Sequence, residues 1–298
     1  MNILHVDNLR KRFGSQVALD GVNLIIEAGQ VFGLLGPNGS GKTTLLAVLL
    51  DVVRADGGGF TWFGGAPPRD NPRTRIGALL ESPNFYPYLN ADENLRLVAS
   101  IKRVKAPDID NLLSQVQLKD RRKSAFHTYS LGMKQRLALA ACLIGDPDVL
   151  ILDEPTNGLD PVGMIEVRGI IESIARQGKT ILLASHMLDE VERICSHVGI
   201  LKNGRLLASG PVGSILSDDR TLELATEQPA MEALGRLVSG YLGITRGTRS
   251  GDHWTFEADN SVDPGSLNRW LFEQGITLTR LAVKPRSLER EFLEITSR

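Results

Sequence analysis

The strongest constraint in this sequence is a short loop at residues 36–44, which reads GPNGSGKTT. An apolar run, Val31 to Leu35, precedes it and a helical pattern, Leu45 to Leu50, follows, so it fits G-x-x-x-x-G-K-[ST] between a strand and a helix. The glycines allow consecutive backbone N–H groups to converge on phosphate oxygens, and the helix N-terminus adds the positive end of its dipole. The loop therefore predicts an α/β protein that binds a nucleoside triphosphate. The predicted binding residues are Asn38, Gly39, Ser40, Gly41, Lys42, Thr43 and Thr44.

Two of these side chains have distinct expected tasks. Lys42 is placed to reach the β- and γ-phosphates, and the hydroxyl of Thr43 can ligate Mg²⁺.

A second segment, Ser130 to Asp160, carries adjacent acids at the end of an apolar run. Val149 to Leu152 reads as a buried strand and delivers Asp153 and Glu154 at its carboxyl end. Two neighbouring carboxylates at such an edge are costly unless a cation or a reaction needs them. An ordinary strand that ends in solvated acids is the alternative for this segment alone.

Two further strands end in polar side chains. The apolar run Arg75 to Leu80 ends at Glu81, and Thr180 to Ala184 is followed by Ser185 and His186. Because the carboxyl ends of parallel strands meet at one edge of a sheet, Glu81, Glu154 and His186 are predicted to face the nucleotide together. Taken singly, Glu81 could be a solvated loop acid and His186 a structural histidine.

One aromatic residue near the N-terminus also stands out. Phe13 precedes the turn at Gly14 and Ser15, which leaves its ring exposed unless something stacks on it. Burial in the core is the alternative for any single phenylalanine.

Composition narrows the class of protein. The chain has 298 residues, 42% hydrophobic and 23% charged, and a formal net charge of -1, which gives no global electrostatic reason to expect nucleic acid as a partner. Cys142 and Cys195 lack metal or redox spacing and read as reduced core thiols. The N-terminus lacks the apolar core of a signal peptide, and no apolar stretch is long enough to span a bilayer, so the chain is expected to stay inside the cell.

The order of patterns predicts two domains. Residues 1–213 alternate strands and helices after an antiparallel opening at residues 3–26, with an all-helical block at about residues 88–145. Residues 214–298 follow a β-α-β-β-α-β order, typical of a ferredoxin-like α+β domain, and end in a helix. Trp254, Trp270 and Phe272 in this second part are interpreted as core rather than as a platform for nucleic-acid bases.

From about residue 3 to 210 the motifs together resemble an ATP-binding-cassette (ABC) transporter ATPase. The loop at residues 36–44 resembles its Walker A, Val149 to Glu154 its Walker B, Asn157 to Asp160 its D-loop, and His186 its switch histidine. Residues 130–135, SLGMKQ, resemble its LSGGQ signature. The resemblance implies a P-loop core with a RecA-like mixed sheet, an antiparallel β subdomain and a helical subdomain.

The resemblance also implies roles for residues. Phe13 would stack on adenine, Thr43 and Asp153 would hold Mg²⁺, Glu154 would be the general base and His186 would contact the γ-phosphate. Ser130 and Gly132 would bind the ATP of a second copy of the chain, and Asp160 of the D-loop is also assigned to the nucleotide-binding residues. Glu81 stands where most of the family has glutamine and is assigned to the catalytic and metal-binding groups. Met133 replaces the signature glutamine, so that contact is expected to be lost or passed to Lys134.

The predicted function is therefore an ATPase subunit that forms a head-to-tail homodimer on ATP and drives a separate permease. It would lie in the cytoplasm, peripherally on the inner face of the cell membrane. Residues 81–87, ESPNFYP, are similar to bacitracin- and lantibiotic-resistance exporters, and the C-terminal part to drug-export ATPases, so an antimicrobial peptide, a drug or a lipid is the expected class of cargo. The alternative is a non-transport ABC ATPase that regulates a nucleic-acid or ribosomal assembly.

Overall fold

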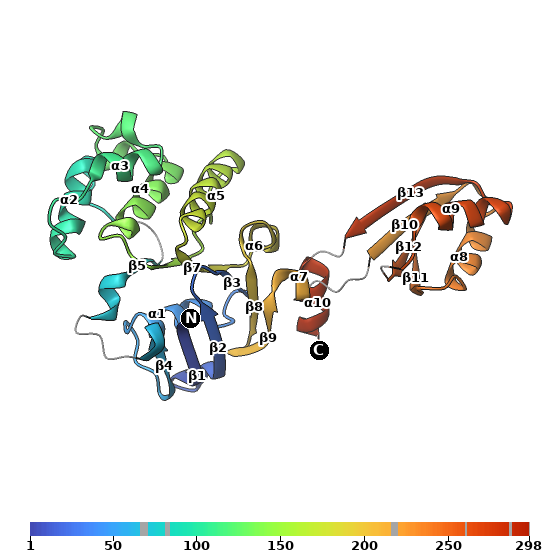
Figure 1. The fold of residues 1–298 in the computed structure, drawn as a ribbon, viewed down its shortest axis with the longest axis horizontal. Coiled ribbons are helices and arrows are strands. Elements are labelled where there is room, and N and C mark those ends of the chain that lie inside the picture. The colour runs from blue at the N-terminus through green and yellow to red at the C-terminus, as the bar shows by residue number, and fades with distance from the viewer. Residues whose placement is uncertain (66–70, 81–83, 216–219, 260, 286–287, 298) are drawn as a thin grey trace. The chain divides into compact units, whose positions relative to one another are not determined.

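The computed structural model describes residues 1–65, 71–80, 84–215, 220–259, 261–285 and 288–297, drawn as ribbons in Figure 1. The chain forms two compact units, Met1–Val212 and Gly213–Arg298. The sequence placed a domain boundary between residues 213 and 214. Each unit has its own hydrophobic core.

The first unit is built on a six-stranded mixed sheet in the order β5-β6-β7-β3-β8-β9. Five strands, β5, β6, β7, β3 and β8, run parallel, and β9 pairs antiparallel with β8. All residues of β3, β6 and β7 are buried, as expected of parallel strands covered on both faces. The strands are β3 (Val31–Leu35), β5 (Ile76–Leu79), β6 (Val149–Asp153), β7 (Thr180–Ser185), β8 (His197–Lys202) and β9 (Arg205–Pro211).

A three-stranded antiparallel sheet, in the order β2-β1-β4, belongs to the same unit. It consists of β1 (Asn2–Phe13), β2 (Gln16–Glu27) and β4 (Gly57–Trp62). Alternating side chains of β1 and β2 enter a core shared with helix α1 (Lys42–Leu49) and the larger sheet. The antiparallel opening predicted from the alternation at residues 3–26 is confirmed.

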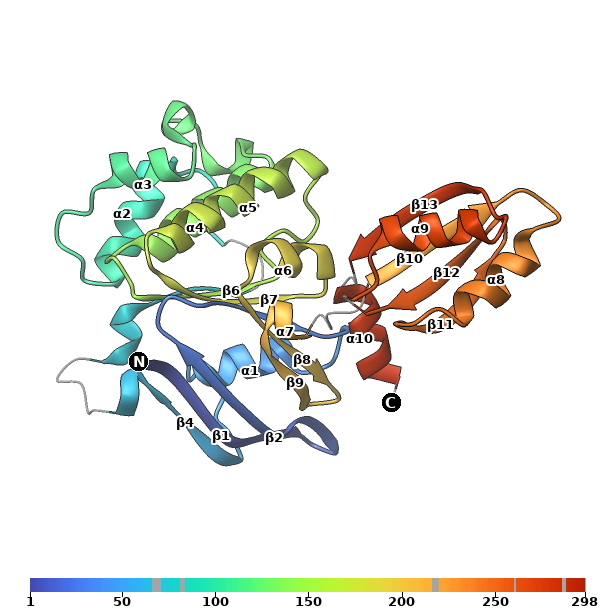
Figure 2. The ribbon, with the colours of Figure 1, turned by 45° about the vertical axis from the view of Figure 1, so that its right-hand side comes forward.

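Helices α2 (Ala91–Ile101), α3 (Ile109–Gln115) and α4 (Leu131–Leu143) form the helical block. Figure 2 shows α4 alongside α5 (Pro161–Arg176), and α6 (Leu188–Ile194) follows β7. The C-terminal end of α4 is closed by Lys102, whose Nζ donates to the carbonyl oxygens of Ala141, Cys142 and Ile144 at 3.1, 3.2 and 3.1 Å. A cation there complements the negative end of the helix dipole.

The second unit is a four-stranded antiparallel sheet in the order β11-β12-β10-β13. With α8 after β10 and α9 after β12, this order is that of a ferredoxin-like fold, so the predicted fold class is confirmed. The elements are α7 (Val212–Ile215), β10 (Arg220–Thr226), α8 (Met231–Ser239), β11 (Ile244–Ser250), β12 (His253–Ala258), α9 (Pro264–Glu273), β13 (Leu278–Pro285) and α10 (Leu288–Ser297).

One carboxylate of the second unit is almost covered by its neighbours on β13. Glu223 is 8% exposed and forms ion pairs with Lys284 and Arg280. The hydrogen bond from Lys284, together with the charge of Arg280, holds the pKa of Glu223 below its usual range.

Three predictions about apolar groups can be compared with the structure. Cys142 and Cys195 are buried and free, as expected of core thiols. Trp254 and Trp270 pack partly buried against the core of the second unit, whereas Phe272 is 69% exposed, so its assignment to the core was wrong. Phe272 lies on α9 one position after the buried Leu271, and a step of one residue turns a helical side chain by about 100°. No helix of the described residues is long and apolar enough to cross a membrane.

Candidate active site

The loop before α1 has a backbone that only glycine can follow at two points. A Cβ on Gly36 would lie 2.3 Å from the carbonyl oxygen of Leu201, and a Cβ on Gly41, where φ is +108°, would lie 2.4 Å from that of Ala18. The loop therefore packs against β2 and β8 without side chains in the way. A bare loop of this kind at a helix N-terminus is suited to wrap phosphate oxygens.

Two polar groups of the loop are held in place for an anion. Lys42 is 6% exposed, and its Nζ donates to the carbonyl oxygens of Gly36 at 2.7 Å and Pro37 at 3.4 Å. Ser40 is 2% exposed, and its hydroxyl finds no hydrogen-bond partner among the residues that the structure describes. Because buried polar groups are nearly always paired, an unpaired hydroxyl beside a lysine fits a site whose missing partner is phosphate.

A cavity of about 260 Å³ opens beside this loop. Phe13, 51% exposed at the end of β1, lines it together with Gln16 and Ala18 of β2 and with Glu154. The remaining lining residues are Asn38, Gly39, Ser40, Gly41, Lys42, Thr43 and Thr44. The structure thus brings the exposed ring and the predicted phosphate-binding residues to one cavity, where an aromatic face and a phosphate cradle lie at reach of one nucleotide.

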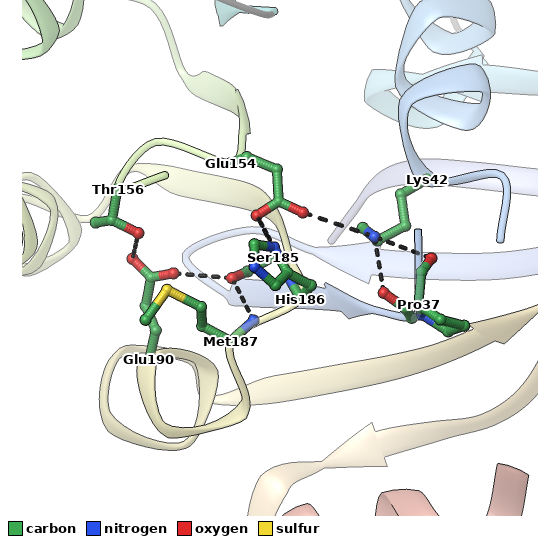
Figure 3. Close-up of polar contacts among 9 residues, drawn as sticks. Pro37, Lys42, Glu154, Thr156, Ser185, His186, Met187 and Glu190 are labelled. Carbon is green, nitrogen blue, oxygen red and sulfur yellow. Dashed lines mark hydrogen bonds and ion pairs between the residues drawn. The ribbon is translucent and has the colours of Figure 1, made fainter. Parts of the chain in front are cut away.

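Glu154 lies between a lysine and a histidine, as Figure 3 shows. One carboxylate oxygen, Oε1, is 3.6 Å from Lys42 Nζ, and the other, Oε2, is 2.7 Å from His186 Nδ1. The parallel pairing of β6 with β7 explains this meeting, because Glu154 N donates to Ala184 O at 2.9 Å. The prediction that Glu154 and His186 meet at one edge of the sheet is confirmed.

The backbone of Glu154 is itself unusual. Its φ is +48°, in the left-handed region that non-glycine residues seldom adopt. Such a conformation costs of order 1–3 kcal/mol and persists where surrounding structure enforces it. The carboxylate of this residue is the one that lies 3.6 Å from Lys42 Nζ.

Glu190, on α6, is a polar residue of this region that the sequence patterns did not single out. It is 5% exposed and accepts hydrogen bonds from Thr156 Oγ1 at 2.8 Å and Ser185 Oγ at 2.9 Å (Figure 3). Burial raises the pKa of Glu190 above its ordinary value, against the lowering effect of the two hydroxyl groups. A signal was present: Glu190 stands four residues before the buried Ile194, which places it on the buried face of α6.

Ser130, Gly132 and Asp160 are not among the residues that line the cavity. Ser130 caps α4 by accepting from Met133 N at 3.2 Å, and Asp160 caps α5 by accepting from Gly163 N at 3.1 Å. A Cβ on Gly132 would lie 3.8 Å from the Cα of Gly163, so the two helix N-termini are neighbours. Ser130, Gly132 and Asp160 therefore stand at two neighbouring helix N-termini, outside the cavity.

The side chains expected to hold Mg²⁺ differ in how well the structure places them. Thr43 lines the cavity, and Asp153 is buried at the end of β6. Glu81 lies outside the described residues. Within the described ranges, no three His, Cys, Asp or Glu side chains gather to hold a metal by themselves. This donor set fits Mg²⁺, which takes one or two protein oxygens and completes its coordination with phosphate and water.

Lys134, in the signature segment, contacts an aromatic ring of its own chain. Lys134 was one candidate to replace the contact of the missing glutamine, but its Nζ lies 5.3 Å above the ring of Phe126. A cation at this distance from an aromatic face is attracted to it. Lys134 is therefore engaged within the helical block.

Comparison with known proteins agrees with this geometry. The sequence profile of the ABC transporter family matches residues 19–157. The bacitracin transport ATP-binding protein BcrA of Bacillus licheniformis is 35% identical over 98% of this chain and 97% of its own length. The chain belongs to the ABC transporter ATP-binding proteins. This ABC protein is also 40% identical to the lantibiotic transport ATP-binding protein SrtF of Streptococcus pyogenes, over 69% of this chain and 89% of that one.

The solved structures include ABC cassettes of the same fold. The cbiO1 protein of Clostridium perfringens, part of the ABC transporter complex cbiONQ, superposes with a TM-score of 0.64 at 27% identity, covering 81% of this chain and 96% of that one. The predicted family and fold are confirmed, and membership in the family implies binding and hydrolysis of ATP. The resemblance to bacitracin and lantibiotic transport proteins is confirmed as well.

Proposed function

We propose that this chain is the ATP-hydrolysing subunit of an ABC exporter, which pairs head to tail with a second copy and drives a separate permease. The observation that carries the proposal is the position of Glu154, bonded to His186 and facing Lys42 at the wall of the cavity. A carboxylate beside a phosphate-binding lysine is suited to act on water at the terminal phosphate.

The first step is binding of ATP. Phe13 offers its exposed face to adenine, while the loop and the Ser40 hydroxyl take phosphate oxygens. Lys42 exchanges its contacts with the carbonyl groups of Gly36 and Pro37 for contacts with the β- and γ-phosphates. Thr43 and Asp153 would hold Mg²⁺, which neutralises phosphate charge when bound.

The second step is hydrolysis. Glu154 orients a water molecule and takes its proton while the water oxygen bonds to the γ-phosphorus and the bond to the β-phosphate oxygen breaks, yielding ADP and phosphate. Since His186 uses Nδ1 to bond Glu154, its Nε2 remains to contact the γ-phosphate. Glu81 is proposed to link this site to the helical block.

The location of Ser130 and Gly132 supports completion of the site by a second copy. They stand at the N-terminus of a 13-residue helix, outside the cavity of their own chain. The side-chain oxygen of Ser130 caps that helix, but its hydroxyl proton can still be donated to phosphate. We therefore place these residues on the γ-phosphate of the partner's ATP, with Asp160 at the same junction.

The transport part of the proposal is supported by the relatives BcrA and SrtF. Because BcrA and SrtF are transport ATP-binding proteins for bacitracin and lantibiotics, the permease of this chain is proposed to export an antimicrobial peptide, a drug or a lipid. The ATPase would then lie in the cytoplasm at the inner face of the membrane, bound to that permease.

The proposal is tested by measuring ATP binding and hydrolysis of the purified chain. Wild type is expected to hydrolyse ATP in the presence of Mg²⁺, whereas Glu154→Gln should bind ATP and turn over about 100- to 10,000-fold more slowly, the range for loss of a general base. Glu27→Gln, at an exposed position of β2, is the control and should match wild type. Wild-type turnover in Glu154→Gln would overturn the assignment of the base.

The transport part is tested separately by purification from membranes under mild detergent. Recovery of the chain with an integral-membrane protein is the expected result. Recovery with ribosomes or nucleic acid instead would overturn the exporter and favour a regulatory ATPase.

A further inference from the structure

Glu190, Thr156 and Ser185 form a small buried network, which we call the Glu190 clamp. The carboxylate of Glu190 accepts one hydrogen bond from each hydroxyl, at 2.8 Å from Thr156 and 2.9 Å from Ser185. The two hydroxyl residues are buried with it, at 3% and 0% exposure. The three residues lie behind the reacting groups, since none of them lines the nucleotide cavity.

The clamp joins the two segments that carry Glu154 and His186. Thr156 stands two residues after Glu154, and Ser185 immediately precedes His186. On the other side of the pair, Glu154 N donates to Ala184 O at 2.9 Å. The two segments are therefore joined both by a backbone hydrogen bond and through Glu190.

The hydrogen bonds of the clamp also fix its orientation. Ser185 Oγ accepts from Met187 N at 3.0 Å while it donates to Glu190, so its hydroxyl cannot rotate without losing one of the two bonds. Met187 N and Ser185 Oγ together also hold the turn that contains His186, as Figure 3 shows. The carboxylate of Glu190 thus restrains the backbone next to Glu154 and the backbone next to His186.

A purely structural purpose would not favour a carboxylate at this place. Burial disfavours the charged form of Glu190, and hydroxyl groups compensate a buried charge less well than a cation does. An apolar side chain would fill the same volume at lower cost, as replacements of buried charges elsewhere indicate. The feature that an apolar side chain could not supply is the pair of directed bonds to Thr156 and Ser185.

The geometry points to Glu190 as a positioning residue for hydrolysis: it holds the backbones on either side so that Glu154 Oε2 and His186 Nδ1 stay bonded at 2.7 Å while water is activated. This inference rests on the proposed ATPase function and adds a residue to it. It requires that loosening the clamp slows the chemical step while the binding of ATP, which uses other residues, is preserved.

The test compares Thr156→Val with Thr156→Ser. Valine fills the volume of threonine without the hydroxyl, so the kcat for ATP hydrolysis is expected to fall about tenfold, equivalent to about 1.4 kcal/mol, with KM for ATP unchanged. Thr156→Ser keeps the hydroxyl donor, so its kcat should lie within about twofold of wild type. Ser185→Ala should reproduce the loss, and the double variant with Thr156→Val should lose less than the product of the two effects, because both act through Glu190.

Thr180→Val is the matched control on the opposite end of β7. Thr180 is 3% exposed, and its hydroxyl accepts from Gly29 N at 2.9 Å, far along the strand from His186. The control loses a buried hydroxyl on the same sheet, so it should lower the melting temperature without changing kcat. If Thr180→Val slows hydrolysis as much as Thr156→Val does, general destabilisation explains both and the clamp is rejected.

The outcomes separate this inference from the proposed function. A wild-type chain without ATPase activity would overturn the function itself. A wild-type chain that hydrolyses ATP, with kcat unaltered in Thr156→Val and in Ser185→Ala, would overturn the clamp alone. If Thr156→Val does not fold, Ser185→Ala with its melting temperature recorded decides the question by the same criterion.

Discussion

One buried carboxylate of the first unit and one of the second are held in opposite ways. Glu190 in the first unit and Glu223 in the second are 5% and 8% exposed. Glu223 is paired with two cations, and its pKa lies below the ordinary value. Glu190 is bonded to two neutral hydroxyl groups, and burial raises its pKa.

The difference shows what each set of contacts is suited to do. Ion pairs on a sheet surface contribute modestly to stability, and Glu223 forms two such pairs. An acid held by hydroxyl groups is an expensive way to fill space, but it directs two short bonds to the segments of a reaction site. The first unit accepts such costs at one sheet edge, where Glu154 also adopts a positive φ.

Replacing one lysine in each unit by methionine should give the largest difference between the units. Lys42→Met removes the cation at the phosphate loop, so affinity for ATP should fall about 100-fold, equivalent to about 2.7 kcal/mol. Lys284→Met removes a lysine that is 56% exposed and paired with Glu223, and should leave ATP affinity unchanged. Equilibrium titration with a fluorescent ATP analogue measures both. A loss of similar size in the two variants would mean that the second unit takes part in nucleotide binding.

A pair of exposed aromatic residues sharpens the comparison with a smaller effect. Phe13→Ala should weaken ATP binding about tenfold, because base stacking is worth about 1–3 kcal/mol in alanine substitutions. Phe272→Ala changes a ring that is more exposed, at 69%, and should bind ATP as wild type does. Phe13→Trp keeps an aromatic face and should retain the affinity. If Phe13→Ala binds ATP normally, adenine does not stack on this ring.

The smallest effect is the pH dependence of stability, where the two acids should give opposite signs. The pKa of Glu223 is lowered, so its ion pairs stabilise the fold above pH 4.5, its ordinary pKa, and the benefit is lost as pH falls through the lowered value. Glu223→Gln should therefore unfold more easily at pH 8 and pH 5 alike, by no more than about 1 kcal/mol because both partners are largely exposed.

For Glu190 the sign is reversed. Its raised pKa means that ionisation destabilises the fold, so the penalty is present at high pH and is relieved as pH falls through the raised value. Glu190→Gln should gain melting temperature relative to wild type at pH 8, and the gain should shrink toward pH 5. Thermal unfolding of the two variants at both pH values measures this, and the same sign for both acids would refute the difference between the units.

Much of the nucleotide site could be predicted from the sequence because its residues lie in short, recognisable sequence patterns. The loop at residues 36–44 needs glycines at fixed positions, and Glu154 and His186 directly follow apolar strands. Parallel strands end at a common edge, so the meeting of residues 154 and 186 followed from chain order alone. The ferredoxin-like order of the second unit was readable for a similar reason, since its strands and helices alternate with clear turns.

The same patterns did not predict contacts between side chains of different helices and strands. Phe272 was assigned to the core as a large apolar residue, although it lies one position off the face of α9 that Leu267 and Leu271 bury, and its ring is 69% exposed. The position of Lys134 Nζ above the ring of Phe126 was likewise not readable from the sequence. Such choices are made by neighbours that are distant in the chain.

By itself, then, the sequence determined the family and the loop at residues 36–44, and it predicted Glu154 as the reacting acid, because these depend on local backbone geometry and on the common edge of a parallel sheet. Only the tertiary structure decided that Glu154 is bonded to His186 and that Glu190 ties their segments together. Thr156 and Glu190 are 34 residues apart, and no periodic pattern records a hydrogen bond between a turn and the buried face of a helix. That contact exists only when α6 packs against the sheet.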